Sequence, residues 1–216
     1  MKEVRAVMCT SGRPYLRMKR SVDLAASLLL LAMLSPVLVF LTTLLFISTG
    51  ANPFFLQERI GREEQKFRVI KLKTMREVRN EGGTLMADAA RLTSLGRIIR
   101  KSSLDELPQL INIVRGEMSF IGPRPLLTRY LPFYTDAERA RHSVRPGISG
   151  LAQVNGRNEL VWSARLAYDI EYVERLSARL DAQILLKTVA AVFRSTGVRV
   201  DVQTGEIKDL DVERRG

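Results

Sequence analysis

The feature that most constrains this chain is a long uncharged stretch near its N-terminus. No charged residue lies between Asp23 and Glu58, and residues 24–47 read LAASLLLLAMLSPVLVFLTTLLFI. Such a stretch is apolar on every face of a helix, which is typical of a membrane-embedded segment. A buried helix of a soluble core is a second reading. A cleaved signal peptide fits poorly, because the stretch is too long and no small-residue cleavage site follows it.

A proline interrupts the middle of this segment. A straight helix over residues 24–47 would reach about 36 Å, enough to cross a hydrocarbon core of about 30 Å. Pro36, directly after Ser35, removes a backbone donor and clashes with the carbonyl of Ala32, which leaves two arms that each reach half-way. We therefore expect either a helix-break-helix that enters and leaves one face of the membrane, or a kinked helix that spans it.

Basic residues flank the segment on both sides. Arg13, Arg17, Lys19 and Arg20 precede it, and Arg59, Arg62, Lys66, Arg68, Lys71 and Lys73 follow it. Under the positive-inside rule both flanks prefer the cytoplasm, which a re-entrant helix allows and a single span does not. From this segment alone both readings stay open.

The charge balance and the scarcity of thiol and imidazole groups limit the chemistry. The 216 residues include 34 Lys and Arg against 23 Asp and Glu, a formal charge of +11, which indicates an anionic partner such as lipid headgroups, a phosphorylated substrate or nucleic acid. Cys9 is the only cysteine and His142 the only histidine. Disulfides, Cys/His zinc sites and Ser-His or Cys-His triads are therefore excluded within this chain.

The rest of the chain is long enough for one catalytic core beside the membrane segment. Alternating apolar and basic residues predict a strand over 67–73, and apolar periodicity predicts helices over 87–100, 105–114, 162–176 and 180–193. We expect a mainly helical α+β protein. Its expected parts are an N-terminal arm (1–17), a membrane helix (18–50), a catalytic domain (51–197) and a polar, mobile C-terminal tail (198–216).

Two adjacent carboxylates stand where one of these helices is expected to begin. Pro108 fits only a first helical turn, so Asp105 and Glu106 are expected at or just before the positive N-terminal end of helix 105–114. Such a pair can hold Mg²⁺ and leave one carboxylate as a nucleophile towards phosphorus. The alternative is structural, because Ser103 and Glu106 also fit a capping box.

Basic residues near this pair favour phosphoryl transfer. Arg100 and Lys101 precede it, and Arg124 follows between two prolines, which suits a reaction that needs preorganised cations around developing charge. The sequence contains neither a GxxxxGK[ST] phosphate loop nor a GxGxxG motif after a strand. The chain is therefore not an ordinary P-loop or Rossmann nucleotide binder.

A series of short motifs follows in order along the chain: Lys19-Arg20-Ser21-Val22-Asp23, Ser35-Pro36, Lys73-Thr74-Met75, Leu104-Asp105-Glu106-Leu107-Pro108-Gln109-Leu110, Gly122-Pro123-Arg124-Pro125, Val144-Arg145-Pro146-Gly147 and Ala152-Gln153-Val154-Asn155-Gly156-Arg157. In this order they resemble the bacterial sugar transferase family, and in particular its small, PglC-like monotopic phosphoglycosyl transferases. The resemblance covers about residues 18–197. An ordered series of this kind is far more specific than any single motif.

The resemblance implies a fold at the membrane and a reaction. It implies a re-entrant membrane helix broken at Ser35-Pro36, with both flanks in the cytoplasm. It implies that Asp105 attacks the sugar-bearing phosphate of a UDP-sugar, releases UMP and holds the phosphosugar until polyprenyl phosphate accepts it. Glu106 matches the partner carboxylate implicated in Mg²⁺ binding, so both carboxylates are candidate metal ligands.

The same matching implies further substrate contacts. The candidates for phosphate and nucleotide contacts are Arg100, Lys73, Arg124 and Arg145, and the further substrate-binding candidates are Gln153, Asn155 and Arg157. Arginine and lysine suit phosphate recognition. The Asn155-Gly156-Arg157 ending resembles enzymes that use N-acetylated amino sugars. Leu151 stands where many members carry Trp, a departure that concerns local packing or sugar preference rather than the reaction.

We therefore expect a protein of the bacterial inner membrane that works at its cytoplasmic face. Its expected partners are a UDP-sugar donor, a polyprenyl phosphate acceptor, Mg²⁺ and the phospholipid membrane, with no nucleic acid. A one-step transfer, in which polyprenyl phosphate attacks the donor directly and Asp105 only holds metal, is the enzymatic alternative. The rival from another class is a membrane-anchored basic module that binds nucleic acid or anionic lipid, although its charges are dispersed and no helix-turn-helix or RRM pattern accompanies them.

Overall fold

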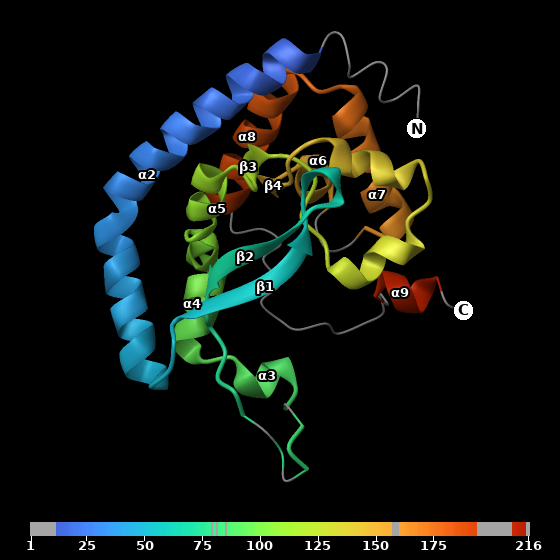
Figure 1. Ribbon diagram of the computed structural model, residues 1–216. Coiled ribbons are helices and arrows are strands. Elements are labelled where there is room, and N and C mark those ends of the chain that lie inside the picture. Colours follow the sequence, from blue (N-terminus) through green and yellow to red (C-terminus); the bar gives the residue numbers. More distant parts are fainter. Residues whose placement is uncertain are drawn as a thin grey trace.

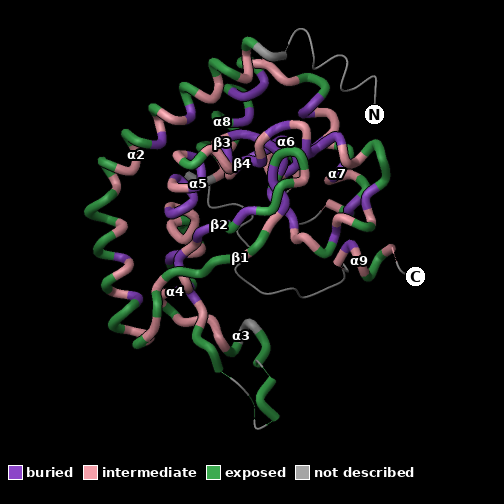
Figure 2. The backbone as a smooth tube through the Cα atoms, viewed as in Figure 1, coloured by how far each residue is buried: buried purple, intermediate pink, exposed green. Residues whose placement is uncertain are grey.

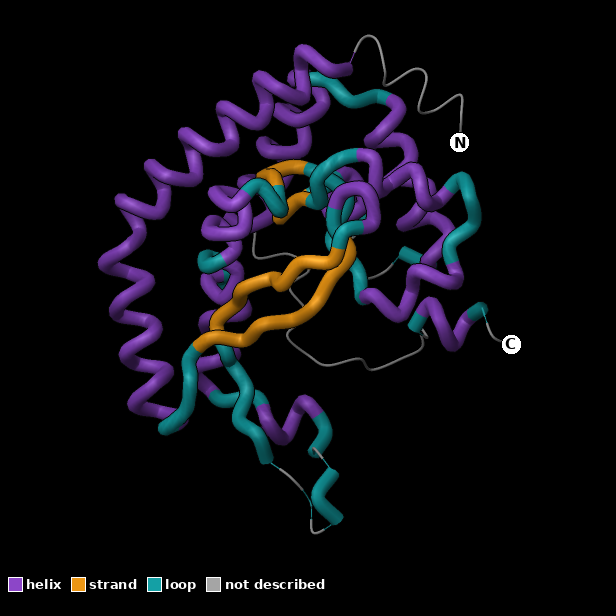
Figure 3. The backbone as a smooth tube through the Cα atoms, in the orientation of Figure 1, coloured by secondary structure: helices purple, strands orange, loops and turns teal. Residues whose placement is uncertain are grey.

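The computed structural model describes residues 12–78, 80, 82–84, 86–156, 160–193 and 209–214. Within these residues, helices dominate: one long helix, α2 (Gly12–Thr49), lies along a body of shorter helices that surround two small two-stranded sheets (Figures 1 and 3). The expected mainly helical α+β class is confirmed for this part of the chain.

Helix α2 contains the uncharged segment and begins at Gly12, inside the stretch expected as an N-terminal arm. Its part Pro14–Thr49 is long and apolar enough to cross a membrane, with a mean hydropathy of 2.5 in its most apolar 18-residue window. Only 11% of that window is buried, and Figure 2 shows exposed residues recurring along the helix. A core helix of a soluble protein is mostly buried, so this reading of the segment has no support in the structure.

The helix continues through Pro36, whereas we expected a break in helical structure there. Pro36 has no N–H for the carbonyl of Ala32, but Ser35 Oγ donates a hydrogen bond to that carbonyl at 2.9 Å. The hydroxyl thus satisfies the acceptor that the proline leaves open. In place of a helix-break-helix, the chain forms one curved helix (Figure 1).

Both ends of α2 contact the same body of the protein. Near its start, Arg20 Nη1 donates to the carbonyl of Ile113 at 2.5 Å. Near its end, Arg76 Nη2 donates to the carbonyl of Ser48 at 3.1 Å, and the side chain of Leu45 is fully buried. The long helix is therefore attached to the body at its two ends.

A hairpin follows α2 directly. Strand β1 (Phe54–Ile60) pairs antiparallel with β2 (Lys66–Leu72), and a short 3-10 helix, η1 (Arg62–Glu64), connects them. The strand predicted over 67–73 is confirmed with a shift of one residue. Phe67 and Val69 of β2 are buried against Leu110 and Ile113 of α5, and Lys71, two residues after Val69, lies on the same face of the strand.

The helix predicted over 87–100 is wrong as a single element. The structure has two helices there, α3 (Asp88–Arg91) and α4 (Ser94–Lys101). Thr93 causes the interruption, because its extended backbone leaves the helix and its hydroxyl accepts a hydrogen bond from Gly96 N at 2.8 Å. This is an N-cap, which starts α4 anew.

Two short parallel strands bring together the two proline-containing loops. Helix α5 (Gln109–Arg115) leads into β3 (Ser119–Ile121), which pairs with β4 (Gly147–Ser149). A Cβ on Gly147 would lie 2.2 Å from the backbone nitrogen of Gly122. Only glycine permits this approach, so the loop that carries Arg124 is held against the loop before β4.

The remaining elements complete the body. They are η3 (Thr128–Phe133), η4 (Glu138–Ser143), α6 (Leu151–Asn155), α7 (Trp162–Glu174), α8 (Ala178–Phe193) and α9 (Leu210–Glu213). Helices α7 and α8 confirm the helices predicted over 162–176 and 180–193. In the tail, expected to be mobile, Leu210 is fully buried and Arg214 Nη2 lies 2.6 Å from Glu138 Oε1. These contacts contradict the expectation of mobility for residues 209–214. The sequence did not predict them, because one apolar residue among charged ones gives too little periodic signal to indicate a packed helical turn.

Candidate active site

The two adjacent carboxylates lie in a 3-10 turn, η2 (Leu104–Glu106), which we call the acidic turn. Helix α5 begins only after Pro108, because proline has no N–H to donate to the carbonyl of Leu104. The N–H of Leu107 donates to that carbonyl at 3.3 Å instead, a 3-10 bond. The predicted helix start at Asp105 was wrong, and the electrostatics of the acidic turn come from side chains around it.

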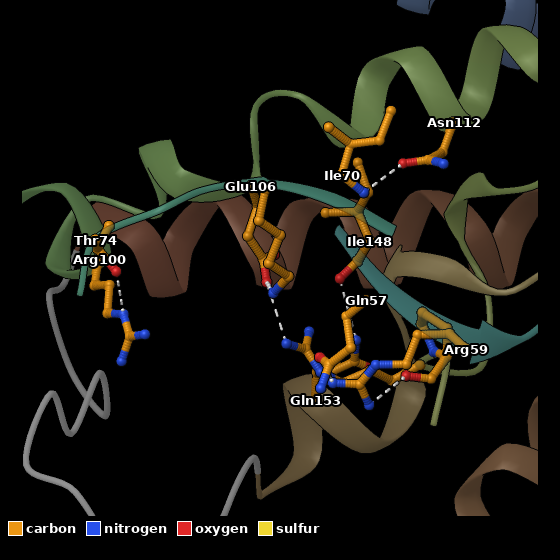
Figure 4. A network of polar contacts seen from close by, with 12 residues as sticks. Gln57, Arg59, Ile70, Thr74, Arg100, Glu106, Asn112, Ile148 and Gln153 are labelled. Carbon is orange, nitrogen blue, oxygen red and sulfur yellow. Dashed lines mark hydrogen bonds and ion pairs between the residues drawn. The ribbon is translucent and has the colours of Figure 1, made fainter. Parts of the chain in front are cut away.

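Glu106 is bound by two cations from distant parts of the chain. Its Oε1 lies 2.6 Å from Lys71 Nζ and 3.1 Å from Arg124 Nη2 (Figure 4). Ser103 has a left-handed backbone with φ of 58° and makes no capping bond through its side chain. The capping-box alternative for Ser103 and Glu106 is therefore wrong.

The two carboxylates have opposite electrostatic environments. Burial alone would raise the pKa of Glu106, but the charges and hydrogen bonds of Arg124 and Lys71 outweigh it and lower that pKa to about 2. Burial and the neighbouring Glu106 charge raise the pKa of Asp105 to about 6, against the opposing charges of Lys71 and Arg100. Glu106 is thus a fixed anion, whereas Asp105 is a more basic carboxylate that still ionises below neutral pH.

A buried asparagine sets the position of Lys71 relative to the acidic turn. Asn112 on α5 accepts a hydrogen bond from the backbone N–H of Ile70 at 3.1 Å (Figure 4). It also donates to the carbonyl of Arg68 at 2.8 Å. These bonds join α5 to β2 as another strand would. Because Glu106 lies one turn before α5, the next strand residue, Lys71, reaches its carboxylate.

Arg100 lies on the α4 side of the acidic turn. Its Nε donates to Thr74 Oγ1 at 2.7 Å, and its charge lowers the pKa of Asp105. Helix α4 packs tightly on the chain here, because a Cβ on Gly96 would lie 2.1 Å from the carbonyl oxygen of Thr74. The expectation that Arg100 lies near Asp105 agrees with this geometry.

Lys73, expected to contact the substrate phosphates, pairs with a neighbouring carboxylate in the structure. Its Nζ lies 2.6 Å from Glu77 Oε1, an exposed pair four residues apart. The lysine that contacts the acidic turn is Lys71 of β2, two residues before Lys73. The alternation of basic residues in this strand was a signal for such a contact, but it does not identify which lysine makes it.

A buried ion pair positions the loop of Arg124. Arg141 Nη2 lies 2.7 Å from Asp169 Oδ2 and also donates to the carbonyl of Arg124 at 2.7 Å. The side chains of Arg141 and Asp169 are each only 2% exposed. This ion pair fixes the backbone of Arg124, whose guanidinium then reaches Glu106.

Two further arginines near Arg124 had no assigned role in the sequence. Arg59 Nη1 donates to the carbonyl of Pro125 at 3.4 Å, and Arg165 on α7 lies over the ring of Trp162 at 4.5 Å from its centroid. Burial lowers the pKa of both arginines, and the charge of Arg124 lowers it further. No motif pointed to Arg165, whereas Arg59 was visible only as one of many flanking basic residues.

The other expected substrate residues lie apart from the acidic turn or outside the residues that the structure describes. Arg145 donates through Nε to the carbonyl of Gly116 at 2.7 Å and lines a hollow with Lys19, Arg20 and Asp23. This contact caps the C-terminal end of α5, the opposite end of that helix from Glu106. The structure therefore does not bring Arg145 to the two carboxylates.

The structure describes two of the three remaining substrate candidates, Gln153 and Asn155. Gln153 donates to the carbonyl of Ile148 at 3.2 Å, and its buried Oε1 has no hydrogen-bond partner among the described residues (Figure 4). Asn155 Oδ1 accepts from Lys187 at 3.2 Å. Arg157 lies outside the described residues.

The acidic turn fits a magnesium ion only as part of a larger set of ligands. No group of three or more His, Cys, Asp or Glu that could hold a metal occurs among the described residues. Asp105 and Glu106 provide two adjacent carboxylates, and Mg²⁺ is commonly held by one or two carboxylates together with substrate phosphates and water. The pair therefore suits Mg²⁺ that arrives with a phosphorylated substrate, and not a closed metal site.

Comparison with known proteins gives a consistent match. The chain matches the bacterial sugar transferase family over residues 14–195. It is 43% identical over 182 residues to an uncharacterized sugar transferase, EpsL, of Bacillus subtilis (strain 168), which covers 84% of this chain and 90% of that protein.

Two further relatives have names that describe a reaction. The UDP-glucose:undecaprenyl-phosphate glucose-1-phosphate transferase of Caulobacter vibrioides is 37% identical over 188 residues, which covers 81% of this chain and 69% of that protein. The UDP-N-acetylgalactosamine-undecaprenyl-phosphate N-acetylgalactosaminephosphotransferase of Aeromonas hydrophila is 34% identical over 197 residues, which covers 86% of this chain and 46% of that protein.

Proposed function

Because this chain belongs to the bacterial sugar transferase family and is a phosphoglycosyl transferase, we propose that it transfers a sugar 1-phosphate from a UDP-sugar to polyprenyl phosphate, with release of UMP. The names of the relatives from Caulobacter vibrioides and Aeromonas hydrophila describe this reaction type with undecaprenyl phosphate. Family membership also decides against a basic binding module as the chain's role.

The observation that carries the mechanism is the contrast between the two carboxylates. Glu106 is bound by Lys71 and Arg124, which holds its pKa at about 2. Among the described residues, no Lys or Arg nitrogen lies within ion-pairing distance of the Asp105 carboxylate, whose pKa is raised to about 6. At pH 7 Asp105 is mostly ionised and has the more basic oxygen, which favours it as the nucleophile.

The proposed reaction has two steps. In the first, an oxygen of Asp105 forms a bond to the sugar-bearing phosphorus, and the bond to the bridging oxygen breaks, so that its electron pair leaves with UMP. In the second, an oxygen of polyprenyl phosphate bonds to the same phosphorus and the Asp105 carboxylate is restored. Arg100 and Arg124 lie on the two sides of the acidic turn and neutralise the phosphate charge.

Mg²⁺ bound with the diphosphate would neutralise part of the charge that develops during the transfer. Glu106 and Asp105 are the residues that would hold it. Glu106 is ionised at neutral and at mildly acidic pH, because its pKa is lowered to about 2. That property suits a permanent metal ligand better than a nucleophile.

We further propose that α2 is re-entrant, with both ends at the cytoplasmic face of the bacterial inner membrane. Both ends of α2 contact one body, through Arg20 at the start and Ser48 and Leu45 near the end. A helix that spanned the bilayer would hold its ends on opposite faces, about 30 Å apart. The curvature of α2 (Figure 1), a helix that contains Pro36, and the basic flanks support the same arrangement.

For the sugar, we propose an N-acetylated amino sugar, on the similarity of Asn155-Gly156-Arg157 to enzymes that use such donors. The relatives' names include both glucose and N-acetylgalactosamine, so they do not favour one sugar. A panel of UDP-sugars with and without the N-acetyl group tests this point. Faster UMP release from UDP-glucose or UDP-galactose than from every N-acetylated donor would contradict it.

The first experiment measures UMP release and a covalent adduct together. The full chain in nanodiscs, with Mg²⁺ and a labelled UDP-sugar but no acceptor, is expected to retain one labelled phosphosugar on Asp105 by mass spectrometry. Asp105→Asn is expected to lose both the adduct and UMP release, whereas Asp136→Asn, an exposed aspartate, retains both. UMP release that requires the acceptor and leaves no adduct would favour the one-step transfer instead.

A further inference from the structure

The cations around the acidic turn fall into two groups on opposite sides of Glu106. Figure 4 shows Thr74 and Arg100 on one side of the Glu106 side chain and Arg59 with Gln57 on the other. Arg124, which contacts Glu106, belongs to the second group with Arg59, whose Nη1 donates to the carbonyl of Pro125, the next residue in the chain. Arg165 belongs to it as well, because it lies one turn before Asp169 on α7, and Asp169 binds the Arg141 side chain that holds the carbonyl of Arg124. The two groups have different surroundings.

The group with Arg100 lies next to the membrane helix. Ile99 directly precedes Arg100 on α4, and Leu72 lies two residues before Thr74. Both side chains are buried in one cluster with Leu41 and Leu45 of α2. A lipid-borne phosphate that reaches the acidic turn from the membrane meets this side first. We therefore call this side membrane-proximal.

The group with Arg59 lies away from the membrane helix. Strand β1 runs from the end of α2 toward α7 (Figure 1), and Ile60, the residue after Arg59, is buried with Trp162, Leu166 and Leu210. That cluster contains no residue of α2. We therefore call this side membrane-distal.

The charges of Arg59 and Arg165 have no carboxylate partner in the described part of the chain. Arg59 Nη2 donates to Gln57 Oε1 at 2.5 Å and Nη1 to the carbonyl of Pro125, and Arg165 donates to the carbonyl of Leu160 at 3.4 Å. None of these acceptors carries a charge. Two guanidinium groups are thus held, partly buried, near a third that has only Glu106 to balance it.

Such an arrangement is unfavourable without an anion. Burial and the charge of Arg124 lower the pKa of Arg59 to about 10, and the same two causes lower the pKa of Arg165. Like charges gathered in this way are typical of sites that bind phosphate. The fork of the guanidinium suits a phosphate that carries two negative charges after transfer.

We propose that Arg59 and Arg165, together with Arg124, bind the nucleotide phosphate of the donor, the phosphate that leaves as UMP. The assignment rests on the proposed function for the identity of the donor. As the phosphorus–oxygen bond breaks, its electron pair passes to the UMP phosphate, whose charge rises, and the three guanidinium groups stabilise that charge. The membrane-proximal group around Arg100 and Thr74 is left for the phosphate of the lipid acceptor.

The test measures UMP binding and acceptor use in the same variants. Arg59→Met and Arg165→Met are each expected to raise the Kd for UMP, measured by calorimetry on the full chain in nanodiscs with Mg²⁺, by about tenfold or more. The kcat/KM for undecaprenyl phosphate should remain within about twofold of wild type, because in a two-step reaction this ratio reports only the second step, in which Arg59 and Arg165 do not take part. Arg175→Met is the matched control, since Arg175 is an exposed arginine just after α7 that pairs with Glu171, and its Kd for UMP should not change.

Conservative variants guard against misfolding. Arg59→Lys and Arg165→Lys keep the charge and lose the fork, so they should weaken UMP binding less than the methionine variants do. An unchanged Kd for UMP in folded variants overturns the proposal, and so does a lowered kcat/KM for the acceptor with unchanged UMP binding. Failure of the proposed function has a different signature: wild type then binds UMP but releases none from any UDP-sugar, while the Kd values still decide the role of Arg59 and Arg165.

Discussion

Lys71 Nζ lies 2.6 Å from Glu106 Oε1, and this contact joins the acidic turn to strand β2. Burial lowers the pKa of Lys71, whereas the charge of Glu106 raises it again in part. The same lysine lowers the pKa of Asp105. One ammonium group therefore influences both carboxylates. The pH at which Asp105 ionises should accordingly depend on Lys71 and Glu106, and the pH dependence of the reaction measures it.

The first prediction concerns the pH dependence of the wild-type enzyme. Asp105 attacks as a carboxylate, and burial raises its pKa to about 6. The rate of UMP release should therefore be low at acidic pH, rise through about pH 6 and level off above it. Single-turnover UMP release between pH 4.5 and 8 measures this midpoint. A rate that is already maximal at pH 4.5 would contradict the assigned environment of Asp105.

The second prediction concerns Lys71→Met. The charge of Lys71 lowers the pKa of Asp105, so its removal should raise that pKa. The pH at which UMP release is half-maximal should therefore move above the wild-type value. At pH 7 the rate should fall by about 10- to 100-fold, because a cation near the transferred phosphate is also lost. Lys66→Met, on the same strand but exposed and paired with Glu58, is the control and should leave the midpoint unchanged.

The third prediction concerns Glu106→Gln and has the opposite sign. The Glu106 charge raises the pKa of Asp105, so its removal should lower the midpoint of UMP release. The variant also loses a proposed ligand and should need more Mg²⁺ for half-maximal activity. Titration of Mg²⁺ at several pH values measures both effects. Glu58→Gln, an exposed residue of β1, serves as the control, and equal Mg²⁺ requirements in the two variants would argue against Glu106 as a ligand.

The fourth prediction concerns the buried pair of Arg141 and Asp169. Both side chains are 2% exposed, so Asp169→Asn leaves an uncompensated guanidinium and should lower the free energy of unfolding by about 3–5 kcal/mol. The exposed pair of Arg175 and Glu171 provides the comparison, since Glu171→Gln should cost less than about 1 kcal/mol. Denaturant unfolding measures the difference. Equal stability of the two variants would mean that the buried pair does not hold the loop of Arg124.

The fifth prediction concerns the topology of α2. In a Cys9→Ser background, Arg17→Cys lies before the apolar segment and Lys66→Cys after it. If α2 is re-entrant, a membrane-impermeant thiol reagent should label neither position in intact cells and both in lysed cells. Labelling of one position in intact cells would indicate a helix that spans the membrane.

The expectations that the structure or the family bears out rest on local patterns. The uncharged segment appears as an exposed apolar helix, the alternation over 67–73 as β2, and the periodic runs near the end as α7 and α8. The family was visible in the order of the motifs and is confirmed. Each of these signals lies within one stretch of chain, where composition and period are enough to predict an element.

The expectations that were wrong failed where a single side chain competes with the backbone. Ser35 satisfies the carbonyl that Pro36 leaves open, so α2 continues. Thr93 caps α4 and divides one predicted helix into two, and Pro108 delays the start of α5. Propensity describes the average outcome for such residues, and it does not predict which hydrogen bond a particular hydroxyl or proline neighbour will make.

The sequence by itself determined that a long uncharged apolar segment precedes the ordered motifs of the bacterial sugar transferase family, with Asp105 and Glu106 side by side. Only the tertiary structure decided which cations lie around them: Lys71 at Glu106, with Arg59 and Arg165 on the side of Arg124, whereas Arg145 lies at the far end of α5. The physical reason is distance along the chain. Asp105 and Glu106 are neighbours by covalent geometry, whereas their counter-charges arrive from separate strands, loops and helices that packing alone brings together.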